Sequence, residues 1–143
     1  MLLNVSYNNK KISRQIDTEV GPPFTLRERI KKRGIGSSKL IITDASVTIQ
    51  NLLLLDNNRN QCNIELRPRG IIVGFRSLLE SFALVIPYYQ LALYKGTAAT
   101  YSFYRNTYFI KIEARPKDKA THAFIQKILK DKAAQAPTRP DEE

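Results

Sequence analysis

The chain has 143 residues, of which 43% are hydrophobic, a composition that predicts one folded domain and excludes a chain disordered throughout. Its net charge of +10 favours an anionic partner, although the same charge also serves solubility alone. The single cysteine excludes an intrachain disulfide and favours a reducing, cytoplasmic compartment.

The first third of the chain is predicted to hold one strand and one short helix. Alternating apolar residues favour a strand over 2–7, and the polar stretch 8–21 is interpreted as a loop. Thr25 and Glu28 have the spacing of a capping box, which predicts a helix over 26–33. This helix carries the densest basic cluster of the chain: Arg27, Arg29, Lys31, Lys32 and Arg33.

Positive charge is concentrated towards the N-terminus. Residues 1–40 hold nine Lys or Arg against three acids, residues 41–115 hold eight against five, and residues 116–143 hold six against five. An electrostatic partner is therefore expected to meet the first third, with the basic helix as its first contact and Arg67 and Arg69 as its second. A competing structural reason is that the helix dipole favours basic residues in a last turn.

The middle of the chain alternates between strand and turn residues. Strands are expected over 39–43, 46–55, 61–66, 71–75, 82–86, 88–94, 100–104 and 107–114, with turns at 44–45, 56–60, 67–70 and 95–97. Pro87 cannot donate to a sheet and marks a bend or an edge. The best hairpin is the last one, where Asn106 tolerates the left-handed conformation that its turn requires.

A helix is predicted over 118–134, because four apolar residues fall on one face: Phe124, Ile125, Ile128 and Leu129. Residues 136–143 are expected to be a disordered tail. No transmembrane segment is expected, since the apolar runs 52–55 and 83–86 are far shorter than the roughly 20 residues needed to span a bilayer. The first ten residues lack the pattern of a signal peptide.

Motifs of catalysis and cofactor binding are not found in the sequence. It has no Walker A loop, dinucleotide fingerprint or zinc spacing, so neither a cofactor nor a metal is expected. Cys62 would need His122, the only histidine, as a catalytic partner, and is interpreted as a half-buried strand residue. The acids of the strand region are spread one per element, which gives no paired-carboxylate site: Asp44, Asp56, Glu65, Glu80 and Glu113.

Tyrosines gather in the predicted strands near cations. They are Tyr88, Tyr89, Tyr94, Tyr101, Tyr104 and Tyr108, beside Lys95, Arg105 and Lys111. Such a surface could stack single-stranded nucleic acid. The competing interpretation is the strand propensity of tyrosine at a wet sheet edge.

The segment 82–93, with its core Val-Ile-Pro-Tyr-Tyr-Gln-Leu, resembles the I-P-Y/W-x-x-L element of bacterial pleckstrin-homology-like (PH-like) domains. The later hairpin and helix follow the same order of elements. The resemblance covers roughly 39–134 and implies a mostly β (α+β) fold. That fold is a PH-like antiparallel barrel, or two bent sheets, capped by a C-terminal amphipathic helix. It also implies a binding scaffold rather than a catalyst.

We therefore expect a PH-like domain over 39–135, with a strand, basic loop and short helix over 1–38 packed on it. The expected function is a non-enzymatic, cytoplasmic binding domain for a protein or an anionic membrane surface. One alternative is a nucleic-acid-binding protein, and another is an enzyme or small-ligand carrier with a pocket inside the barrel. A homodimer through a strand edge near Pro87 or through the Phe and Tyr surface is also open.

Overall fold

The computed structural model describes residues 1–7, 9–55, 60–96 and 99–135. The strands of this part are β1 (Leu2–Asn4), β2 (Leu40–Ala45), β3 (Gln61–Arg67), β4 (Gly70–Ser77), β5 (Glu80–Pro87), β6 (Ala92–Gly96), β7 (Thr100–Arg105) and β8 (Tyr108–Glu113). The helices are α1 (Lys10–Val20), α2 (Leu26–Lys31), α3 (Val47–Leu54), the short 3₁₀ helix η1 (Tyr88–Gln90) and α4 (Lys119–Ala134).

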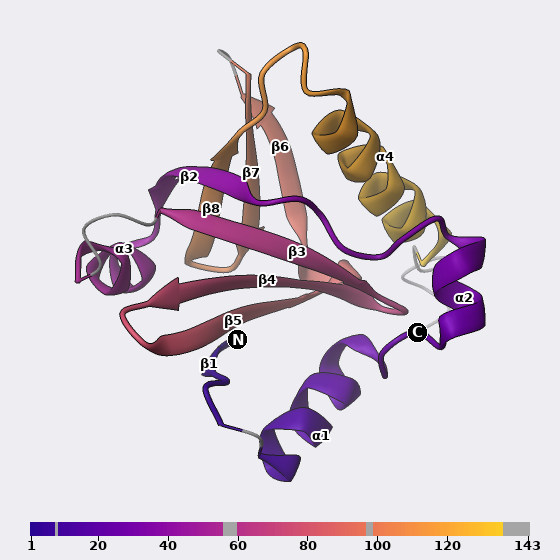
Figure 1. The fold of residues 1–143 in the computed structure, drawn as a ribbon, viewed down its shortest axis with the longest axis horizontal. Coiled ribbons are helices and arrows are strands. Elements are labelled where there is room, and N and C mark those ends of the chain that lie inside the picture. Colours follow the sequence, from indigo (N-terminus) through magenta and orange to yellow (C-terminus); the bar gives the residue numbers. More distant parts are fainter. Residues whose placement is uncertain (8, 56–59, 97–98, 136–143) are drawn as a thin grey trace, which may run out of the picture.

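The strands form one open antiparallel sheet in the order β1-β5-β4-β3-β2-β8-β7-β6. Strand β2 joins its two halves: Leu40 and Ile41 pair with β3, whereas residues 42–45 pair with β8, with a register shift between Ile42 and Asp44. The half containing β3, β4 and β5 crosses the half containing β6, β7 and β8 steeply (Figure 1). The mostly β, α+β class and the C-terminal helix are thus confirmed.

The main core lies between the two halves of the sheet. Alternating residues of the strands point into it, as the period of two requires, including Ile64, Ile71 and Phe103, each at most 1% exposed. Helix α4 adds three of the four residues predicted for its apolar face, Phe124, Ile125 and Ile128. The fourth, Leu129, is 39% exposed.

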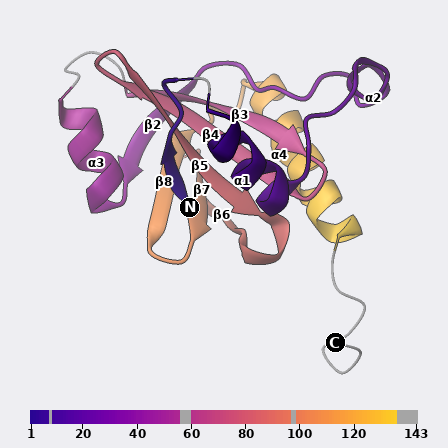
Figure 2. The same ribbon diagram turned by 90° about the horizontal axis from the view of Figure 1, so that it is seen from below.

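Helix α1 covers part of the outer face of the sheet (Figures 1 and 2). The interpretation of 8–21 as a loop is therefore wrong. Ile12, Ile16 and Val20 recur every four residues and form a narrow stripe, which contacts a second, smaller core on β4 and β5. The Asn9 side chain caps the first turn by accepting from two backbone N–H groups.

The long strand predicted over 46–55 is also wrong, because this segment forms α3. Ile49 and Leu53, four residues apart, are buried on one face of the helix. Leu54 and Leu55 are exposed at the end of this helix. The Ser77 hydroxyl, at the end of β4, donates to the backbone carbonyl of Leu52 in α3. The predicted turn 44–45 is wrong as well, since both residues belong to β2.

The other predictions fare better. The hairpin of β7 and β8 is confirmed, with Asn106 at a φ of 55° in its turn. Pro87 ends β5, and the strand predicted over 88–94 divides into η1 and β6. The predicted turns 56–60 and 95–97 fall largely or partly outside the described residues, and the tail 136–143 falls wholly outside them.

Within the described residues, no helix is long and apolar enough to cross a membrane.

Candidate binding surface

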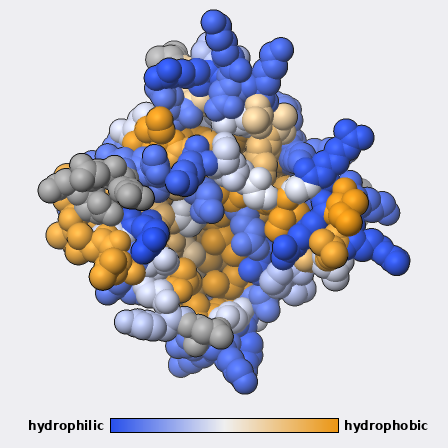
Figure 3. Space-filling view, viewed as in Figure 1, coloured by the Kyte–Doolittle hydropathy of each residue, from blue (hydrophilic) through white to orange (hydrophobic). Residues whose placement is uncertain are grey.

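Helix α2 is unusual in having no buried residue. It stands at the rim of the molecule, away from the sheet, in both views of the ribbon (Figures 1 and 2). Leu26 and Ile30, four residues apart on one face, are 74% and 71% exposed. Figure 3 shows hydrophobic residues at this edge of the molecule among hydrophilic ones.

Local sequence explains why a helix of six residues forms here. The predicted capping box is confirmed: the Thr25 N–H donates to Glu28 Oε1 at 2.9 Å, and the Glu28 N–H donates to Thr25 Oγ1 at 3.3 Å. Hydrogen bonding of the Glu28 carboxylate to Thr25, chiefly to its backbone N–H, lowers the pKa of Glu28 and keeps it ionised beside the helix N-terminus. Arg33 and Gly34 then adopt positive φ angles of 61° and 97°, which ends the helix.

Two of the five basic candidates of this segment hold the fold together. Arg29 Nε donates to the carbonyl of Phe24 at 3.1 Å. Lys32 Nζ forms an ion pair with Asp131 of α4 at 3.1 Å and lies 5.0 Å from the centre of the Phe24 ring. These contacts anchor the otherwise exposed helix to the body of the protein.

The side chains of Arg27, Lys31 and Arg33 are exposed and have no hydrogen-bond or ion-pair partner in the described part of the chain. With the two exposed apolar residues they make up the α2 surface, which we define as Leu26, Arg27, Ile30, Lys31 and Arg33. The α2 surface combines three free cations with a small apolar face, so it suits an anionic, partly apolar partner.

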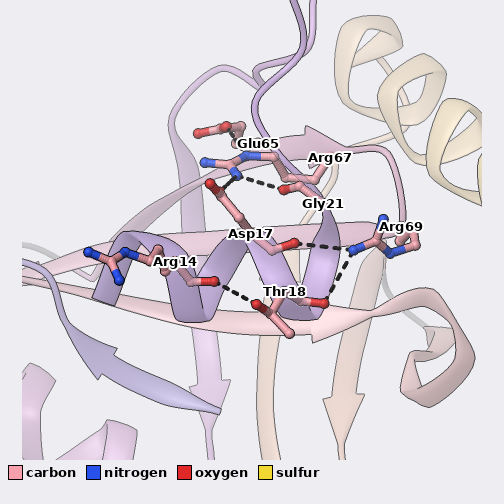
Figure 4. Close-up of polar contacts among 7 residues, drawn as sticks. All are labelled: Arg14, Asp17, Thr18, Gly21, Glu65, Arg67 and Arg69. Carbon is pink, nitrogen blue, oxygen red and sulfur yellow. Dashed lines mark hydrogen bonds and ion pairs between the residues drawn. The ribbon is translucent and has the colours of Figure 1, made fainter. Parts of the chain in front are cut away.

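The second pair of basic candidates, Arg67 and Arg69, fastens α1 to the sheet (Figure 4). Arg67 is only 9% exposed, and its guanidinium donates to Asp17 Oδ1 at 3.1 Å, to Glu65 Oε2 at 2.6 Å and to the carbonyl of Gly21 at 2.9 Å. Arg69 donates to two more carbonyls at the C-terminal end of α1. Both arginines donate to carbonyl groups at the C-terminal end of α1, and their positive charge suits the helix dipole there. We therefore do not include them in the α2 surface.

Replacing Arg67 by alanine is expected to destabilise the protein by about 2 kcal/mol, because the buried Gly21 carbonyl loses its charged donor. The two ion-pair partners are partly solvated and add little. Arg14→Ala, an exposed arginine of α1, is the matched control and should change stability by less than about 0.5 kcal/mol. Urea unfolding measures both, and equal midpoints would show that Arg67 does not anchor α1.

Cys62 and His122 are both used structurally. Burial raises the pKa of the Cys62 thiol to about 12, which leaves it a poor nucleophile. His122 Nε2 lies 2.9 Å from the Arg115 carbonyl, which only accepts, so Nε2 carries the proton. His122 Nδ1 then accepts from the Tyr101 hydroxyl at 2.7 Å, which ties α4 to β7.

The tyrosines do not form one open stacking platform. Tyr89 and Tyr94 are 74% and 61% exposed. Tyr88 and Tyr101 are buried in the core, and Tyr104 packs between the rings of Tyr94 and Phe109. Burial accounts for most of the increase in the pKa of Tyr88.

Neither protein-family models nor curated proteins nor solved structures match this chain. No group of three or more His, Cys, Asp or Glu side chains is placed to hold a metal ion in the described ranges. A function for this chain can therefore be proposed only from the placement and chemistry of its own residues. The sequence indicates the basic residues of 27–33. It does not distinguish Arg29 and Lys32, whose side chains have partners in the fold, from the basic residues of the α2 surface.

Proposed function

We propose that this chain is a non-enzymatic, PH-like domain that docks peripherally on an anionic membrane surface through the α2 surface. One observation carries the proposal: an exposed apolar pair, Leu26 and Ile30, stands among three cations without partners in the described chain. A lysine or arginine near an anionic leaflet contributes about 1 kcal/mol of binding free energy. Apolar side chains that enter the headgroup boundary add to this attraction.

The arrangement of the elements supports the PH-like part of the proposal. The core lies between two halves of a bent antiparallel sheet, and β2 takes part in both. Helix α4 contributes Phe124, Ile125 and Ile128 to this core, as expected of a helix that closes an open end. Fold alone does not give a function, so the α2 surface carries the choice of partner.

A membrane suits the α2 surface better than a protein partner does. A stable protein interface buries about 800 Å² on each side around an apolar centre, and two exposed side chains are too few for such a centre. A membrane needs no matching shape, and weak apolar insertion together with several cations is sufficient for reversible binding.

The test is sedimentation with vesicles of phosphatidylcholine alone and of phosphatidylcholine mixed with phosphatidylserine, at low and at physiological salt. We expect binding to the mixed vesicles that weakens with salt, and no binding to phosphatidylcholine alone. A third arm uses single-stranded RNA. Equal binding to both vesicle types, or RNA binding at physiological salt without vesicle binding, would overturn the proposal.

A further inference from the structure

A groove of about 420 Å³ lies on the outer face of the sheet, beside the region that α1 covers. Helix α1 packs over Ile72, Ala83 and Val85, and leaves the neighbouring positions of β3 and β4 open. Eight residues line the groove, and five of them are polar or charged: Lys39, Gln61, Asn63, Arg76 and Ser81, together with Cys62, Gly74 and Phe75. They come from β3, β4 and β5 and from the residue before β2.

Gly74 leaves room in the groove for the Asn63 side chain. On β4 it lies between two residues that share its face, Ile72 and Arg76, and it pairs with Asn63 of β3. Because Gly74 has no side chain, the Asn63 side chain lies over it, with Oδ1 only 2.9 Å from where a Cβ atom would stand. The Asn63 amide therefore occupies the space beside the Gly74 backbone and lines the groove there.

The charge of the groove is positive. Lys39 and Arg76 are exposed and have no ion-pair partner in the described ranges, and no acidic residue lines the groove. Two acids of the same strands are engaged elsewhere: Glu65 pairs with Arg67, and Glu80 accepts from the Asn4 side chain. The two cations of the groove therefore have no acidic residue among the other residues that line it.

We infer that this groove binds a small phosphomonoester, with the phosphate between Lys39 and Arg76 and the rest of the molecule against the Gln61 and Asn63 amides. A phosphomonoester carries a charge of about −1.5 to −2 at pH 7, which two cations match, whereas a carboxylate carries about −1. The volume lies within the range of about 300–1,000 Å³ that is usual for small-molecule sites. This site is separate from the α2 surface and does not depend on the proposed membrane contact.

Isothermal titration calorimetry of the whole chain tests this inference, with AMP and ribose 5-phosphate as probes and adenosine and ribose as their uncharged counterparts. We expect saturable binding of at least one phosphomonoester, and none of its counterpart. In the variant Lys39→Gln/Arg76→Gln, binding should weaken by about tenfold or more, because both charge-assisted contacts are lost. In Lys10→Gln/Lys11→Gln, which removes the same charge from α1, binding should stay unchanged.

Gly74→Ala provides a second variant that leaves the charge unchanged. Its Cβ atom would displace only the end of the flexible Asn63 side chain, so the fold should persist while an amide that lines the groove is moved. Urea midpoints near that of the parent chain check this expectation, and phosphomonoester binding should weaken. The inference is overturned if neither phosphomonoester binds, if the uncharged counterparts bind equally well, or if the Lys39/Arg76 variant binds as tightly as the parent.

Discussion

Replacing Gly70 by alanine is expected to destabilise the protein by about 3 kcal/mol, towards the upper end of the usual cost of overpacking. A Cβ atom at this position would meet the carbonyl oxygen of Ile86, and it would lie 2.5 Å from Val20 Cγ1 and 2.8 Å from Pro87 Cα. Two of these atoms belong to the backbone of the paired strand, which cannot move aside. The third belongs to α1, so the substitution also pushes the helix off the sheet.

Gly36→Ala is the matched control for this substitution. A Cβ atom at Gly36 has nothing within 4 Å, and its φ lies outside the left-handed region. Its effect should stay within about 0.5 kcal/mol. Urea unfolding followed by circular dichroism compares the two variants, and a Gly70→Ala midpoint equal to that of Gly36→Ala would contradict the close packing of α1 on β4.

The triple variant Arg27→Gln/Lys31→Gln/Arg33→Gln is expected to weaken binding to phosphatidylserine vesicles by about 100-fold. Each of the three cations contributes about 1 kcal/mol near an anionic surface, and 1.4 kcal/mol corresponds to about a tenfold change in affinity. None of the three side chains has a partner in the described chain, so stability should change little. Vesicle titration gives the affinity, and thermal unfolding checks the fold.

The control for this variant removes the same charge from another basic helix. Lys10, Lys11 and Arg14 of α1 are exposed, and their replacement by glutamine also lowers the net charge by three. If the net charge of +10 alone drives binding, both triple variants should weaken it equally. Our proposal requires a clearly larger loss for the α2 variant.

The sequence predicts those elements whose pattern has a local cause. The capping box of Thr25 and Glu28 places α2, and the turn at Asn106 places the last hairpin. The sequence pattern does not predict helix α1, because the buried face of this helix is narrow and most of its residues are polar. Helix α3 is predicted as a strand because Val, Ile and Leu also suit a strand. Tertiary packing decides between helix and strand here.

The candidate site could be predicted only in part, for a different reason. All five cations of 27–33 look equivalent in the sequence. In the fold, Lys32 forms an ion pair with Asp131, almost a hundred residues later in the chain, and Arg29 donates to the backbone carbonyl of Phe24. Leu26 and Ile30 are exposed because no other described element buries this face of α2. A local sequence pattern does not predict such an absence of packing.

A polarity-sensitive fluorophore on Ile30→Cys tests most directly whether the α2 surface meets the membrane. The natural Cys62 is buried with a raised pKa, so labelling should select the introduced thiol. A second label at Leu79→Cys reports on the β4–β5 turn, where Leu79 is 88% exposed. With phosphatidylserine vesicles, we predict a blue shift of the label at position 30 and none at position 79. A shift at position 79 alone, or at neither position while the protein binds, would contradict the proposed contact.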